Sequence, residues 1–109
     1  MCGIAGMIDL TTGRRPAPAG VVPRMANAIL HRGPDEDGFL NRDGFHLANV
    51  RLSIVGLADG KQPIANESQT AWTVFNGEFF DYPEVRTALE AKGHKFRTHT
   101  DTELIPHLW

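Results

Sequence analysis

Apolar residues follow two different spacings in the first third of this chain of 109 residues. The stretch Gly3–Leu10 is rich in Ile, Ala, Gly and Met, which predicts a buried first strand. From Ala19 to His31 the apolar side chains recur on one helical face, and this predicts a helix whose first turn holds Pro23. The run Arg32-Gly33-Pro34 should end this helix, with Gly33 as a left-handed cap.

Short apolar runs separated by polar turns follow the first helix, a pattern typical of a small antiparallel sheet. These runs are Phe39-Leu40, Phe45–Ala48 and Leu52–Val55, and a further strand is predicted over Thr70–Phe75. The acidic segment Pro34–Gly38 and the segment Gly56–Asn66 are predicted to be loops.

The last third predicts helices with recognisable start signals. Asp81-Tyr82-Pro83-Glu84 is a capping box that should open a helix to Lys92, and Gly93 should end it. His94–His99 then reads as a strand. Thr100-Asp101-Thr102-Glu103 is a second capping box before a short helix, which Pro106 should kink or shorten. Strands first and helices interleaved at both ends favour a layered arrangement of helices and sheet.

Composition is that of one soluble globular domain, with 41% hydrophobic and 22% charged residues. The formal net charge of -2 offers no electrostatic basis for binding nucleic acid or an anionic membrane. The sequence shows no signal peptide and no run long enough to span a bilayer. One cysteine excludes an internal disulfide framework, which fits a reducing cytoplasm.

The single cysteine, Cys2, lies one residue from the start of the chain. If Met1 is removed, Cys2 carries both a thiol and an α-amine, whose pKa of about 7.7–8.0 lets it accept the thiol proton. A thiolate beside a base is the usual form of a cysteine nucleophile. The alternative is a small buried residue in an edge strand, and position alone favours that alternative.

Neither a metal site nor a nucleotide site is indicated by spacing. The histidines lack the spacings of a zinc site, so we expect each of them to be solvated or structural. They are His31, His46, His94, His99 and His107. No phosphate-binding glycine motif is present. Asn76-Gly77 follows a predicted strand, and on spacing alone it indicates a tight hairpin turn.

Five separated motifs nevertheless occur in an order and spacing typical of a known family. They are Met1–Gly6, Arg32–Asp35, Arg51–Ile54, Asn76–Glu78 and Gly93–Glu103. Together they resemble the glutaminase domain of class II glutamine amidotransferases, which are N-terminal-nucleophile hydrolases. The acidic run after Arg32-Gly33 is most similar to glutamine-hydrolysing asparagine synthetases. Each motif is weak alone, but the ordered set is specific and covers essentially the whole chain.

The resemblance implies an α+β fold, the αββα layered sandwich of N-terminal-nucleophile hydrolases. Residues 1–109 would be the N-terminal part of the glutaminase domain, with the synthetase domain absent. We therefore expect no cofactor in this chain, because ATP and Mg would be needed only in the synthetase domain. The expected partners are L-glutamine and that synthetase domain, in the cytoplasm, and whether the chain forms a homodimer is left open.

The resemblance also implies roles for single residues. Cys2 would attack the glutamine side-chain amide, and the resulting oxyanion would be bound by the Asn76 side chain and the Gly77 N–H. Arg51 would bind the α-carboxylate of glutamine through its guanidinium fork. The α-ammonium would be bound by Asp101, with acceptors around Glu78.

Two other functions remain open at this point. One is a non-catalytic remnant that binds glutamine or a partner, but the joint presence of Cys2, Arg51, Asn76, Gly77 and Asp101 speaks against it. The other is a purely structural module, which explains the strands and helices but not the cysteine at position 2.

Overall fold

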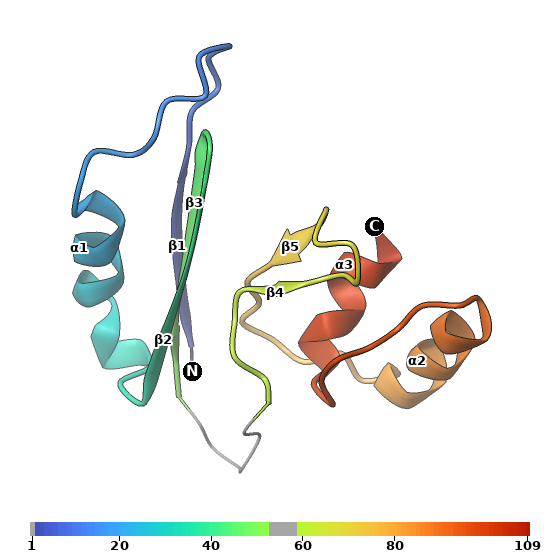
Figure 1. Cartoon of the computed structure of the whole chain (residues 1–109). Helices are drawn as coiled ribbons and strands as arrows, with labels where there is room; N and C mark the ends of the chain where they lie inside the picture. The colour runs from blue at the N-terminus through green and yellow to red at the C-terminus, as the bar shows by residue number, and fades with distance from the viewer. Residues whose placement is uncertain (1, 53–58) are drawn as a thin grey trace. The chain divides into compact units, whose positions relative to one another are not determined.

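The computed structural model describes residues 2–52 and 59–109. The chain divides into two compact units, Met1–Val55 and Gly56–Trp109, which are described in turn (Figure 1). The predicted strand Leu52–Val55 and the predicted loop Gly56–Asn66 lie partly outside the described residues.

The first unit is built on a three-stranded antiparallel sheet in the order β1-β3-β2. Its strands are β1 (Gly3–Ile8), β2 (Glu36–Arg42) and β3 (Phe45–Arg51). The central strand β3 pairs Val50 with Gly3 and Arg51 with Glu36. The start of β1, the start of β2 and the end of β3 therefore lie at one end of the sheet (Figure 1).

One face of this sheet is covered by α1 (Val21–Ala28), which packs on β1 and β3 (Figure 1). The core between them consists of Val22, Ala26, Ala48 and Val50. The first strand was predicted correctly, but it is not buried throughout, because Ile4 and Ile8 of β1 are exposed. The residues of a strand alternate between two faces, and α1 covers only one of them.

Gly33 does not act as the left-handed cap that the sequence predicts. It follows a 3₁₀ turn, η1 (Leu30–Arg32), with an extended φ of -158°. A Cβ atom on Gly33 would lie 2.5 Å from the backbone nitrogen of Arg51 and from the carbonyl oxygen of Val50. Glycine is needed here because the chain passes directly against β3, and Pro34 then bridges Arg51 in parallel.

The second unit holds a small antiparallel pair, β4 (Ile64–Ala65) and β5 (Trp72–Thr73). It also contains α2 (Tyr82–Ala91), the 3₁₀ turn η2 (Asp101–Glu103) and α3 (Leu104–Leu108). α3 packs against both α2 and β5, and Leu104 at its start is completely buried. The core of this unit therefore forms around the short last helix.

The predicted strand His94–His99 is wrong, because this segment pairs with no strand within residues 2–52 and 59–109. The backbone N–H groups of Arg97 and Thr98 instead donate to the buried carboxylate of Glu103, each over 2.8 Å. A buried carboxylate at the end of η2 thus accepts the N–H groups that a neighbouring strand would otherwise bind. The strand predicted over Thr70–Phe75 is real but shorter.

The predicted helix caps are confirmed only in part. Asp81 precedes α2 without a side-chain capping bond. Thr100 caps η2, because its hydroxyl accepts from the Thr102 N–H over 3.4 Å. Gly93 ends α2 with a φ of 97°, as predicted. α3 continues past Pro106, which lies in the first turn of the helix, where a proline is tolerated.

The described residues thus form an α+β arrangement of antiparallel sheets and three α-helices. Two histidines fit the structural or solvated roles expected of them. His46 is buried and joins the Ala17 N–H to the Asn41 side chain, whereas the side chain of His99 is 83% exposed and pairs with Asp59. Among the helices of the described ranges, none has the length and apolar character needed to cross a membrane.

Candidate active site

Cys2 is a free, partly buried cysteine directly before β1. Its carbonyl oxygen accepts a hydrogen bond from Arg32 Nε over 3.1 Å. The next residue, Gly3, is buried so closely that an added Cβ would lie 2.9 Å from Ile29 and 3.0 Å from Val50. The backbone that carries the thiol is therefore held from both sides, whereas an isolated chain end is usually loosely ordered.

Arg51 ends β3, at the same end of the sheet as Cys2. Its side chain is 12% exposed and pairs with Glu36 on β2, with Nη1 and Oε2 3.3 Å apart. The pairing of Gly3 with Val50 places position 2 next to position 51 in the register of β1 and β3. The first unit therefore brings the predicted nucleophile and the predicted carboxylate-binding residue together.

Asn76, Gly77 and Glu78 form an exposed segment of the second unit, between β5 and α2. The hairpin interpretation of Asn76-Gly77 is wrong, since the chain continues into α2 and forms no partner strand. Gly77 also lacks the positive φ that a hairpin turn of this type needs. An added Cβ on Gly77 would lie 2.7 Å from the ring of Phe75, so glycine occupies this position because a larger residue would clash with that ring.

Asp101 lies beside this exposed segment. Its Oδ2 accepts a hydrogen bond from the Phe79 N–H over 2.8 Å, one residue beyond Glu78. The Asp101 carboxylate is therefore fixed directly beside the segment Asn76–Glu78. The second unit brings together the other four predicted site residues, namely Asn76, Gly77, Glu78 and Asp101.

Gln62 was not singled out by the sequence, although it supports this segment. It is 7% exposed, and its Oε1 accepts from the Phe75 N–H over 2.7 Å while its Nε2 donates to Thr102 Oγ1 over 3.4 Å. One side chain thus joins the residue before Asn76 to the residue after Asp101. A glutamine in a predicted loop carries no local signal for such a role.

Comparison with known proteins gives the family. A sequence profile for the glutamine amidotransferase domain matches residues 1–109. The chain belongs to this domain family.

Relatives of this amidotransferase domain are named asparagine synthetases. The chain is 39% identical to asparagine synthetase [glutamine-hydrolyzing] 1 of Bacillus subtilis (strain 168) over 106 residues, which are 96% of the chain and 17% of that protein. It is 36% identical to asparagine synthetase [glutamine-hydrolyzing] 1 of Arabidopsis thaliana over 109 residues, which are 100% of the chain and 18% of that protein. The amidotransferase domain described here thus spans less than a fifth of either relative.

Proposed function

We propose that this amidotransferase domain hydrolyses glutamine with Cys2 as the nucleophile and supplies ammonia for asparagine synthesis. The observation that carries the proposal is the family match over residues 1–109, which includes Cys2 and the Asn76-Gly77 segment. The relatives are named glutamine-hydrolysing asparagine synthetases, and these names support asparagine synthesis as the reaction that uses the ammonia. An αββα sandwich, a neighbouring synthetase domain that uses ATP and Mg, and a cytoplasmic location belong to the same proposal.

The proposed reaction begins at the thiol of Cys2 after removal of Met1. The α-amine of Cys2 takes the thiol proton, and the sulfur adds to the side-chain carbonyl carbon of glutamine. The C–N bond then breaks, and ammonia leaves with the proton held by the amine. Water hydrolyses the thioester to give glutamate and restores the thiol. Each addition forms an oxyanion, which Asn76 Nδ2 and the Gly77 N–H stabilise.

Substrate binding in this proposal uses two charged side chains, one from each unit. Arg51 is mostly buried at the end of β3, so its guanidinium has little freedom to lose when it binds the glutamine carboxylate. Asp101 is anchored by the Phe79 N–H, which orients its carboxylate for the substrate ammonium. A free α-amino acid carries both of these groups, so this pair selects it over a protein-bound glutamine.

A steady-state glutaminase assay tests the proposal. Purified chain, and the chain extended to the length of its relatives, should each release glutamate and ammonia in equal amounts from L-glutamine. Asparagine should form only with the extended protein, in the presence of aspartate, ATP and Mg²⁺. Glutamine binding without release of glutamate by either protein would instead indicate a binding module and overturn the proposed hydrolysis.

Arg51→Lys should raise KM for glutamine by roughly tenfold or more, because a lysine keeps the charge but loses the two-pronged hydrogen bonding. The matched control is Arg24→Lys, which changes an exposed arginine on α1. Steady-state kinetics and thermal unfolding of both variants give the measurement. A lowered melting temperature with unchanged KM would mean that Arg51 serves only its ion pair with Glu36.

A further inference from the structure

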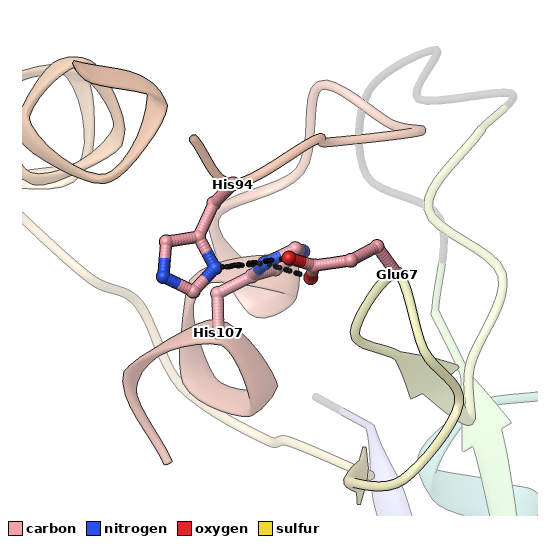
Figure 2. Close-up of side chains that lie close together, drawn as sticks. All are labelled: Glu67, His94 and His107. Carbon is pink, nitrogen blue, oxygen red and sulfur yellow. Dashed lines mark hydrogen bonds and ion pairs between the residues drawn. The ribbon is translucent and has the colours of Figure 1, made fainter. Parts of the chain in front are cut away.

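Three side chains of the second unit, none of them a predicted site residue, converge at one point (Figure 2). Glu67 comes from the turn between β4 and β5, His94 from the segment after α2, and His107 from α3. Figure 2 shows both rings and the carboxylate directed toward one another. The proposed glutamine hydrolysis uses none of them.

The distances in this Glu67–His94–His107 cluster are those of ligands around one metal ion. Glu67 Oε1 lies 3.2 Å from His94 Nδ1, Glu67 Oε2 lies 2.8 Å from His107 Nδ1, and the two Nδ1 atoms are 3.2 Å apart. Tetrahedral ligands at roughly 2.0–2.2 Å from zinc are about 3.3–3.6 Å from one another. The two 3.2 Å separations would therefore need to open by about 0.1–0.4 Å, and the 2.8 Å separation between Glu67 and His107 by about 0.5–0.8 Å.

His107 faces carboxylates on both sides of its ring. Its Nδ1 points to Glu67, and its Nε2 lies 3.6 Å from Oε1 of Glu103, which is 1% exposed. His107 Nε2 is a completely buried nitrogen without a hydrogen bond to any residue that the structure describes. A neutral imidazole has one N–H, so either tautomer aims a lone pair at one of the two carboxylates.

A cation at Nδ1 resolves this conflict. Nδ1 then gives its lone pair to the cation, and Nε2–H points toward the Glu103 carboxylate, the outer-shell arrangement common for metal-bound histidine. A second proton on His107 alone would also let both of its nitrogens donate, with the N–H of His94 on Nδ1, so metal titration has to separate the two arrangements.

We propose that Glu67 together with Nδ1 of His94 and of His107 binds a divalent transition metal, with zinc as the preferred ion. Two imidazoles and one carboxylate suit zinc better than calcium or magnesium, which favour oxygen ligands. Water completes the coordination on the side where Glu67 and His94 are partly exposed. The metal ties the β4–β5 turn and the segment after α2 to α3. This assignment replaces the expectation, drawn from spacing alone, that the chain has no metal site.

The test is titration of the whole chain, freed of metal by a chelator, with Zn²⁺. We expect one zinc per chain and an increase in melting temperature. Loss of an outer-shell partner alone costs roughly 10- to 100-fold in metal affinity, so Glu67→Gln and His94→Gln should each weaken binding by at least about 100-fold. The matched control is His99→Gln, because His99 forms a 2.8 Å pair with Asp59 outside the cluster and should bind zinc like the unaltered chain.

A second measurement needs no variant. Co²⁺ added to the unaltered chain should give the strong visible absorption of a four-coordinate cobalt site, and Zn²⁺ should remove it. The proposal is wrong if that absorption is missing, or if folded Glu67→Gln and His94→Gln chains bind zinc as tightly as the His99→Gln chain. Either result would make the cluster a proton-bound network of one carboxylate and two imidazoles.

Discussion

Cys2→Ser is expected to lower glutaminase kcat by at least about 10⁴-fold, since loss of a catalytic nucleophile removes the whole covalent route. A serine hydroxyl is a much weaker acid than a thiol and stays protonated near neutral pH, so serine attacks the amide far more slowly in a site built for a thiolate. The substitution exchanges one atom and leaves both the Arg32 bond to the Cys2 carbonyl and the packing of Gly3 in place. Unfolding temperature should therefore stay near that of the unaltered chain.

Intact mass provides the decisive measurement for Cys2. The active chain should lack Met1, and an electrophilic glutamine analogue should add one adduct, because Cys2 is the single cysteine. An adduct that survives Cys2→Ser would identify another nucleophile. Full activity in a species that retains Met1 would exclude the α-amine of Cys2 as the base.

Asn76→Asp should lower kcat for glutamine hydrolysis by roughly 10²–10³-fold, the usual cost of losing one oxyanion donor. A carboxylate has no N–H to donate, and its negative charge repels the developing oxyanion. The fold should tolerate the change because Asn76 is exposed. Its neighbours are held independently of it, Phe75 by Gln62 and Phe79 by Asp101.

The matched control for this prediction is Asn66→Asp. Asn66 is a turn residue whose Oδ1 accepts from the N–H groups of Thr70 and Ala71 over 2.9 and 3.2 Å. Aspartate keeps that acceptor, so turnover should remain near normal. Steady-state kinetics and thermal unfolding of both variants separate the two roles. Equal kcat in the two variants would show that Asn76, like Asn66, only shapes the chain.

Several features of this domain follow from short stretches of sequence. Gly93 after an apolar helical face ends α2 in a left-handed conformation, as the pattern predicts. Val22, Met25 and Ile29 belong to the predicted apolar face, and all three lie in or pack against the core between α1 and the sheet. The motifs around Cys2 and Asn76 led to the family that the profile match then established. The helix features depend on residues within one or two turns of each other, so local spacing predicts them. The family follows from the order of several short motifs along the chain.

Other features depend on contacts between distant residues, which only the tertiary structure decided. Glu103 was predicted to cap its own helix, but its buried carboxylate instead accepts the backbone N–H groups of Arg97 and Thr98. These N–H groups are therefore not available to a strand partner, and the strand predicted for this segment does not form. Glu67, His94 and His107 show no metal-binding spacing, because three different elements bring them together. A buried polar group must find a partner wherever folding places one, and the spacing of residues along the chain does not reveal that partner.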